Sequence, residues 1–430
     1  MSVASESADK MALSEPDQKG NVPPQFLDFK KMSTTERRQY NKKRRRERKM
    51  QRRKEYLGTI ETPEFFVHAG KRCIIPYWHD FRCFARHRWV DQPFLATLLD
   101  EFPACTPSFL EASINAGRMK LNGKIVTSSD FDRLLALGDV VEHRVHRHEP
   151  PVLDQPINIL PNLSKEPLSG VYAVNKPSSI PVHPCGGYTY NSLHRIVVLP
   201  PISLPPSIQP VHRLDKLTSG VVVMADSPER CGQLSQLISD RKVSKTYIAC
   251  VSGTLGVVGE EIVVDEPLWS DRAGRLLGKC DRKLGKPACT IITILAQHEN
   301  ETLVKCKPIT GRTHQIRIHL QFLGFPIIGD PLYQLQDKED QEDNQYTFMR
   351  KMAPFPPREE YLADETQSFN SPLCVFEKDD ICMTCNDVIP DQPISTMYMC
   401  LHSIFYKGDG WSFYADPPFW CEKFLSTICL

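Results

Sequence analysis

The pattern of apolar and polar positions predicts a mixed α/β region between residues 170 and about 333. Val221–Ala225 is an uninterrupted apolar run with three valines, which is typical of a buried strand. Ser227 and Pro228 follow it and predict a helix start, with serine as the cap and proline in the first turn. Further strands are predicted at "YAV" (Tyr172–Val174), "KTYIACVSG", "ACTIITILAQ" and "TLVKCKPIT". The irregular alternation of the two patterns favours an α+β domain.

Another helix is predicted over residues 313–323. Ile316, Leu320 and Leu323 recur at helical spacing, and Gly324 closes the pattern. The free backbone N–H groups of the first turn, next to a nearby arginine, predict an anion site there.

Arg317 lies at the edge of the buried face of this predicted helix. A guanidinium is costly to bury without a carboxylate partner, so Arg317 implies one. Asp215 is the candidate, because it lies in the loop "HRLDKLT" that leads into the Val221–Ala225 strand. Loops on a rigid strand often carry catalytic side chains, although such a loop can also be merely a solvated surface.

Residues 90–146 have the pattern of a small compact module. An amphipathic helix that ends at Gly117 offers four apolar positions for burial: Phe109, Leu110, Ala112 and Ile114. Asn122-Gly123 then predicts a tight hairpin turn. This order resembles the αL RNA-binding module that a small-subunit ribosomal protein shares with many RNA-modifying enzymes. The resemblance places Arg118, Lys120 and Lys124 where that module meets phosphates, and the alternative is a small α+β spacer.

Charge is distributed unevenly along the chain. Residues 30–54 hold 14 Lys or Arg against two Glu, a net of +12, whereas the whole chain carries +1 and the other residues therefore sum to −11. Such a block favours contact with a polyanion or an import receptor, and the alternative is a solvated basic helix without a partner. The N-terminus has no apolar signal and is too acidic for a mitochondrial presequence, and no apolar run is long enough to span a membrane.

The 15 cysteines predict reduced thiols in an intracellular protein, because no secretory signal accompanies them. Cys382 and Cys385 have the spacing of metal ligands, with Cys400 and His402 downstream as further candidates. One such pair is weak evidence, because a structural zinc site needs four ligands. His402 also belongs to a strand pattern, so the preferred interpretation is that no metal is bound.

Three stretches carry a resemblance to a known family: "HRLDKLTSGVVVMA", "KTYIA" and "GRTHQIRIHLQFLGFPIIGD". In this order they resemble the RluA family of RNA pseudouridine synthases. "VNKPSSIPVHP" matches the strand and turn that open the family's catalytic domain, and "LHSIFYKGDGWSFYADPPFW" resembles its closing strands. The resemblance covers about residues 100–333 and 400–420. "EHRVHRHEPP" and the aromatic segment before the small module resemble the eukaryotic branch that modifies the tRNA anticodon loop.

The resemblance implies an isomerase that turns uridine into pseudouridine with no cofactor and no metal. It makes Asp215 the nucleophile, attacking either the base or the sugar, and Arg317 the cation that keeps this carboxylate ionised. Tyr247 matches the tyrosine that stacks on the target base and helps to remove a proton. Arg213 matches the arginine that enters the RNA in place of the flipped base. RNA contacts are expected from His212, which holds the loop, and from Arg312 and His314, which suit phosphates.

The domain organisation follows from these patterns. We expect five parts, each with its own character: a disordered basic tail at 1–60, an aromatic-rich segment of unassigned fold at 61–89, the αL-type module at 90–147, a Pro-rich linker at 148–169, and a catalytic domain at 170–430 with an insertion at about 334–398. The catalytic domain should contain a mixed, largely antiparallel central sheet with flanking helices. The expected substrate is tRNA, with ribosomal RNA as runner-up, and the rival from another class is a non-catalytic RNA-binding or assembly factor. A monomer in the nucleus, the cytoplasm or both, without membrane attachment, is expected.

Overall fold

The computed structural model describes residues 33, 35, 63–102, 105–270, 277–334, 378–386 and 392–425. Every element below belongs to one compact unit, Thr62–Leu430. The basic segment at 30–54 lies almost wholly outside the described residues, as does most of the insertion expected at about 334–398.

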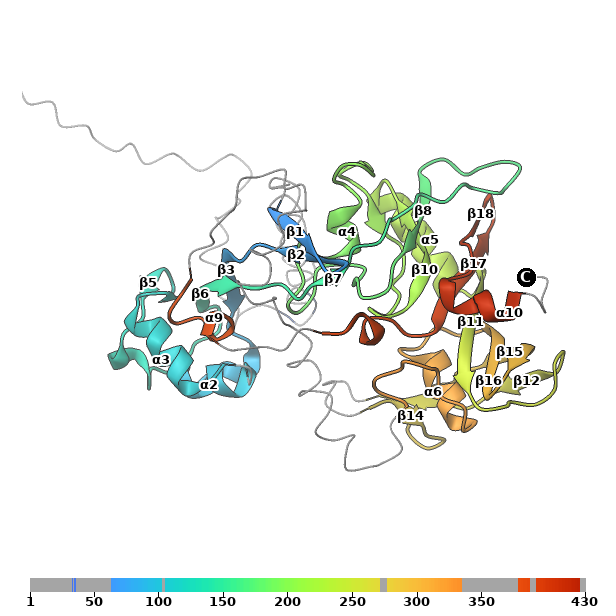
Figure 1. The fold of residues 1–430 in the computed structure, drawn as a ribbon. Coiled ribbons are helices and arrows are strands. Elements are labelled where there is room, and N and C mark those ends of the chain that lie inside the picture. Colours follow the sequence, from blue (N-terminus) through green and yellow to red (C-terminus); the bar gives the residue numbers. More distant parts are fainter. Residues whose placement is uncertain are drawn as a thin grey trace, which may run out of the picture. The chain divides into compact units, whose positions relative to one another are not determined.

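A nine-stranded sheet forms the centre of the described fold (Figure 1). Its strands are β8 (Val171–Lys176), β9 (Gln209–Pro210), β10 (Ser219–Ala225), β11 (Ser244–Ser252), β12 (Glu261–Val264), β15 (Thr290–His298), β16 (Glu301–Pro308), β17 (Leu401–Gly408) and β18 (Trp411–Tyr414). The order is β12-β15-β16-β11-β17-β10-β8, with β18 on β17 and β9 on β10. Among the described strands of this sheet, only β10 and β17 pair in parallel, so the prediction of a mixed, largely antiparallel sheet is confirmed.

Helices flank this sheet where the sequence places caps and apolar stripes. The described α-helices outside the small module are α4 (Leu193–Ile196), α5 (Pro228–Ser239), α6 (Gln315–Phe322), α9 (Met383–Asn386) and α10 (Glu422–Leu425), of which α9 lies beside that module and not beside the sheet. Ser227 caps α5 by accepting the Arg230 N–H at 3.3 Å, as its sequence predicts. α6 begins after His314, whose φ is +55°, and Gly324 follows its end at φ +86°. The helix expected at 313–323 is therefore confirmed, shorter by two residues at its start and one at its end.

The small module has its own sheet and its own core. Its elements are α2 (Phe94–Glu101), α3 (Pro107–Asn115), β3 (Tyr77–Phe84), β4 (Met119–Leu121), β5 (Lys124–Ile125) and β6 (Val140–Arg147). Asn122 and Gly123 have φ of 54° and 79° and form the two-residue turn between β4 and β5, which confirms the predicted hairpin. Leu110, Ile114 and Met119 are among the buried residues of the module's core.

The aromatic-rich segment, whose fold the sequence did not assign, supplies three strands. These are β1 (Phe65–His68), β2 (Lys71–Ile74) and β3, and β3 pairs with β6 along its whole length. The small module therefore takes its edge strand from before residue 90. β1 and β2 form a separate sheet with β7 (Val152–Leu153), and β13 (Leu268–Trp269) pairs with β14 (Lys279–Cys280). Among the described residues, every helix is too short or too polar to cross a lipid bilayer.

Candidate active site

The loop before β10 is fixed on both sides of Asp215. Leu214 and Leu217 are buried in the main core. The Ser178 hydroxyl donates to the Leu217 carbonyl at 2.8 Å, and the buried Lys176 ammonium donates to the Lys216 carbonyl at 3.1 Å. The backbone around the carboxylate is therefore held by groups from the end of β8 and the turn that follows it.

His212 anchors the start of this loop as a neutral side chain. Its ring stacks on Tyr406 of β17, with ring centroids 4.5 Å apart and planes 6° from parallel. The Val223 N–H can only donate, so His212 Nε2, at 3.1 Å, must be an unprotonated acceptor. Burial lowers the pKa of His212 to about 4, in agreement with this tautomer. These two contacts tie the partly buried His212 to β10 and β17 at the start of the loop.

Asp215 and Arg317 meet, although they are 102 residues apart. Arg317 Nη1 donates to Asp215 Oδ2 at 3.0 Å. The same guanidinium makes a bidentate pair with Asp330, with Nε–Oδ2 at 2.7 Å and Nη2–Oδ1 at 2.8 Å. The Arg317 side chain is only 5% exposed and that of Asp330 is fully buried, whereas Asp215 keeps 21% exposure. Asp330 thus neutralises the buried arginine, and the accessible carboxylate is Asp215.

The carboxylate of Asp215 is ionised at neutral pH. Burial acts to raise its pKa, but the interactions of the carboxylate with His314 and with the Arg317 guanidinium outweigh burial and lower it. His314 Nε2 lies 3.7 Å from Asp215 Oδ2. Burial lowers the pKa of His314 below its ordinary value, so this imidazole is neutral at pH 7 and Arg317 supplies the lasting charge.

Tyr247 lies in β11 and is 8% exposed. Its hydroxyl is 2.6 Å from that of Tyr406, the residue on which His212 stacks. Burial raises the pKa of Tyr247 to about 12, opposed by hydrogen bonds from Tyr406 and Ser403, and Asp215 raises it further. Tyr247 is thus a neutral phenol whose pKa is raised in part by the negative charge of Asp215.

The remaining predicted RNA contacts lie in two different settings. Arg213, Arg312, Lys120 and Lys124 are exposed. The Arg312 Nε donates to the Pro287 carbonyl at 3.1 Å, which leaves the rest of that guanidinium at the surface. Arg118 instead forms a bidentate ion pair with Asp379, at 2.6 and 2.8 Å, and its guanidinium lies 4.9 Å from the centre of the Trp78 ring.

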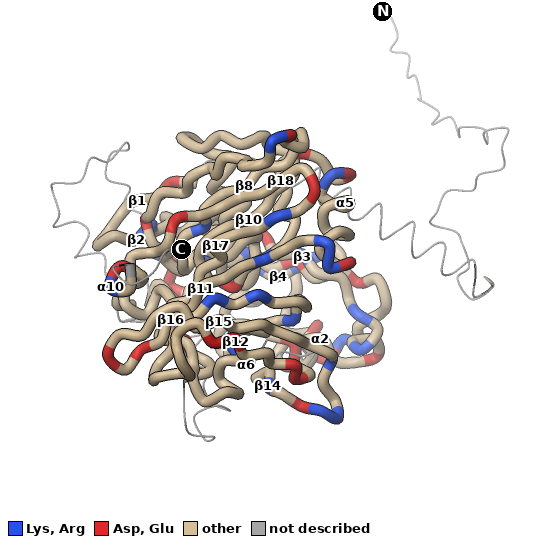
Figure 2. Tube along the Cα trace, turned by 90° about the vertical axis from the view of Figure 1, so that its right-hand side faces the viewer, with Lys and Arg blue, Asp and Glu red and all other residues tan. Residues whose placement is uncertain are grey.

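Charge on the described trace is mixed. Figure 2 shows Lys and Arg positions interleaved with Asp and Glu positions in that view, without a single-sign face. The basic residues of the chain are concentrated in the segment at 30–54, which lies almost wholly outside the described residues.

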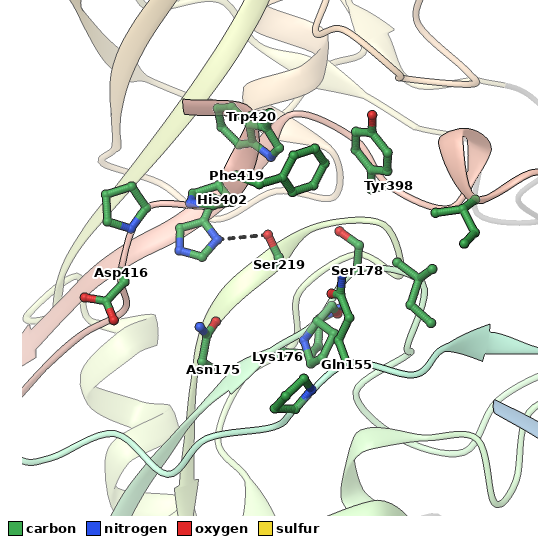
Figure 3. Close-up of a pocket in the computed structure, with 16 residues that line it drawn as sticks. Gln155, Asn175, Lys176, Ser178, Ser219, Tyr398, His402, Asp416, Phe419 and Trp420 are labelled. Atoms are coloured by element: carbon green, nitrogen blue, oxygen red, sulfur yellow. Dashed lines mark hydrogen bonds between the residues drawn. The ribbon is translucent and has the colours of Figure 1, made fainter. Parts of the chain in front are cut away.

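A cavity of about 290 Å³ lies beside the β8 and β10 ends of the sheet (Figure 3). Lys176, Ser219 and His402 line it, with the Ser219 hydroxyl 2.8 Å from His402 Nδ1. None of Asp215, Tyr247 and Arg317 is among its lining residues, so this cavity is separate from the carboxylate site. Lys176 is fully buried, and burial lowers its pKa to about 7.

Sequence reasoning missed three members of the site. Asp330 completes the buried ion pair, and Tyr333 contacts both His314 and Arg317, with its hydroxyl 3.1 Å from His314 Nδ1 and its ring 5.0 Å from the Arg317 guanidinium. Tyr406 joins His212 to Tyr247. The five N–H donors of a buried arginine could have indicated a second carboxylate, since one carboxylate cannot satisfy them all.

The fold and the site together define a class of protein: an enzyme that holds one ionised, accessible carboxylate beside a buried arginine and a neutral tyrosine. A family model described as RNA pseudouridylate synthase matches residues 170–322, which include all three side chains. The chain belongs to this family, as an RluA-type RNA pseudouridine synthase.

Relatives match over much of the chain. A human protein named pseudouridylate synthase RPUSD2 is 31% identical over 83% of this chain and 75% of its own length. Two proteins of Saccharomyces cerevisiae also match. One, named tRNA pseudouridine(31) synthase, is 27% identical over 85% of this chain and 99% of its own length. The other, named tRNA pseudouridine(32) synthase, mitochondrial, is 33% identical over 63% of this chain and 56% of its own length.

Proposed function

We propose that this enzyme makes pseudouridine in tRNA, in the anticodon loop. Two yeast relatives are named for tRNA positions 31 and 32, and the chain spans 99% of the length of one of them. Consecutive positions in two relatives support a shared region of the tRNA as the target. Ribosomal RNA is the alternative substrate, and a mapping experiment on total RNA separates the two.

The observation that carries the proposed mechanism is the 3.0 Å contact between Arg317 and Asp215. A buried guanidinium that already has Asp330 as its counter-charge supports an accessible carboxylate that stays ionised and nucleophilic. In our proposal Asp215 attacks the flipped nucleotide, at either its base or its sugar. The N1–C1′ bond breaks, a C5–C1′ bond forms, and the proton lost from C5 balances the proton gained at N1.

Tyr247 and Arg213 act on either side of this step in our proposal. Tyr247 supplies a flat, neutral ring for the target uracil, and its raised pKa favours stacking over service as a phenolate base. Arg213 is exposed next to Asp215, where its planar guanidinium can occupy the place of the extruded base. Phosphate contacts by Arg312, Lys120 and Lys124 would hold the RNA in register, because all three are exposed.

The test is Asp215→Ala, with Asp240→Ala as a control at an exposed aspartate. We expect the first variant to lose more than about a thousandfold in turnover while RNA binding survives, since a nucleophile has no substitute. The control should keep the parent's rate. Site-resolved pseudouridine mapping of total RNA with and without the gene then names the substrate. Equal turnover by Asp215→Ala and the parent would exclude Asp215 as the nucleophile, whereas a parent chain without any turnover would leave a non-catalytic RNA-binding factor.

A further inference from the structure

The Cys-x-x-Cys pair at Cys382 and Cys385 does not meet the partners that the sequence offered. His402 lies in β17 and its Nδ1 is 2.8 Å from the Ser219 hydroxyl. Cys400 is buried in the main core, before the same strand. Neither belongs to the group of ligand atoms around Cys382 and Cys385.

The pair lies instead beside two histidines more than 230 residues earlier. Cys385 Sγ is 3.2 Å from His146 Nδ1 and 3.2 Å from His148 Nε2. The four ligand atoms of His146, His148, Cys382 and Cys385 all lie within 4.8 Å of one another. Figure 1 shows the short α9 segment lying against β6, the strand that carries His146.

Local geometry aims these side chains at one point. His146 lies in β6 and His148 follows the last residue of that strand, and the ring nitrogens of both histidines lie 3.2 Å from the same sulfur, Cys385 Sγ. Cys382 lies just before α9 and Cys385 lies within it, so one short turn presents both thiols. Cys382 Sγ also lies 3.5 Å from the His146 carbonyl, which brings the two segments into direct contact.

The separations fit a tetrahedral metal site. Bond lengths of about 2.3 Å to sulfur and 2.0–2.1 Å to nitrogen place tetrahedral ligand atoms about 3.3–3.8 Å apart. The two 3.2 Å contacts and the 4.8 Å limit bracket that range. Two thiolates and two imidazoles form the donor set that zinc prefers among the common biological metals.

We propose that His146, His148, Cys382 and Cys385 bind one Zn²⁺ as a structural site that joins the small module to the segment at 378–386. Four protein ligands fill a tetrahedral shell and leave no position for water or substrate, so this metal takes no part in the chemistry at Asp215. Two thiolates and two neutral imidazoles balance the charge of the ion, which allows the site to be partly buried.

Asp379 connects the proposed zinc site to a predicted RNA contact. This residue precedes the thiol pair by three positions and makes the bidentate ion pair with Arg118, one of the predicted phosphate contacts. A metal that fixes residues 378–386 on β6 therefore also fixes the guanidinium of Arg118, which lies over Trp78. The zinc site would therefore fix the position in which the Arg118 region of the small module meets RNA.

Metal analysis of the full chain tests the proposal. We expect about one zinc per chain in protein purified without chelators, and a zinc absorption-edge spectrum with two sulfur and two nitrogen neighbours. Cys382→Ser with Cys385→Ser should reduce the zinc to about a tenth or less, because two ligands cannot hold the ion. Cys280→Ser with His298→Ala is the matched control, since it removes a thiol and an imidazole outside the cluster, and it should keep the metal.

A ligand swap separates binding from folding. His148→Cys keeps four ligands and should retain zinc, whereas His148→Ala should lose it. Co²⁺ added to chelator-treated parent should give the absorption bands of a tetrahedral thiolate complex. A parent chain that carries no stoichiometric zinc and gives no such bands with Co²⁺ would overturn the proposal. A Cys382–Cys385 disulfide in the parent, or zinc retained by the double serine variant, would overturn it as well.

Discussion

The buried cation beside Asp215 can be removed without leaving a buried charge behind. Arg317→Gln alone would strand Asp330, whose side chain is fully buried, and breaking a buried pair in this way costs about 3–5 kcal/mol of stability. Arg317→Gln combined with Asp330→Asn replaces the ion pair with two neutral amides of similar shape. The amide oxygen introduced by Asp330→Asn can still accept the Leu332 and Tyr333 N–H groups that Asp330 Oδ1 accepts at 2.9 and 3.1 Å.

The expected loss follows from the contact at 3.0 Å between Arg317 Nη1 and Asp215 Oδ2. A hydrogen bond to a charged group contributes about 1.5–3 kcal/mol, which corresponds to roughly 10- to 150-fold. Without the guanidinium, burial still raises the pKa of the Asp215 carboxyl, and His314 is the main group left to lower it. In the parent the pKa is lowered, so the ionised form persists through the neutral range and is lost only well into acid. In the double variant we expect the ionised form of Asp215 to be lost at a higher pH than in the parent.

The assay is the pH dependence of single-turnover tritium release from RNA labelled at uracil C5, since that hydrogen leaves when the new carbon–carbon bond forms. At neutral pH we expect the double variant to be at least about tenfold slower than the parent, with part of the loss recovered at higher pH. His314 is present in both proteins, so the difference reports Arg317. A slower variant whose acid limb coincides with the parent's would refute the view that Arg317 keeps Asp215 ionised.

Two further substitutions test the support of the site. Gly220→Ala should destabilise the fold by more than about 3 kcal/mol in urea unfolding, because Gly220 has φ +105° and a Cβ would lie 2.2 Å from the Ser403 carbonyl oxygen. The control Gly232→Ala, in open space within α5, should be neutral or stabilising. A Gly220→Ala variant of unchanged stability would contradict the close approach of β10 and β17. Tyr247→Phe should slow single turnover by less than about tenfold and cost about 1–2 kcal/mol of stability, because the ring stays and the contact with the Tyr406 hydroxyl is lost. A loss of a hundredfold or more would instead assign the phenol a proton-transfer role.

Local rules account for the elements that the sequence predicted well. The Ser227 cap, the Asn122-Gly123 turn and the apolar spacing of α6 depend on neighbours within a few residues, and the structure confirms each of them. The pairing of Arg317 with Asp215 is long-range, yet it was predictable because a buried arginine needs a carboxylate.

Contacts that depend on the path of the chain were not predictable in the same way. Asp330 lies 13 residues after Arg317, and only the turn after α6 brings it back to the guanidinium. The thiols of Cys382 and Cys385 were compared with residues downstream, whereas sheet geometry brings them to His146 and His148 at the end of β6. No periodicity in the sequence encodes a separation of more than 230 residues.

In the loop before β10, some side chains face the protein interior and others are exposed. His212 and Leu214 point inward, to Tyr406 and the core, while Arg213 between them is exposed. Asp215 is held by Arg317 from one side, and the backbone after it is held by Lys176. Asp215, the nucleophile in our proposal, is thus placed and charged before RNA binds, so substrate binding energy is not needed to assemble it. In our proposal that energy remains available for unstacking the target base, and the exposed Arg213 takes the place of the base in the RNA.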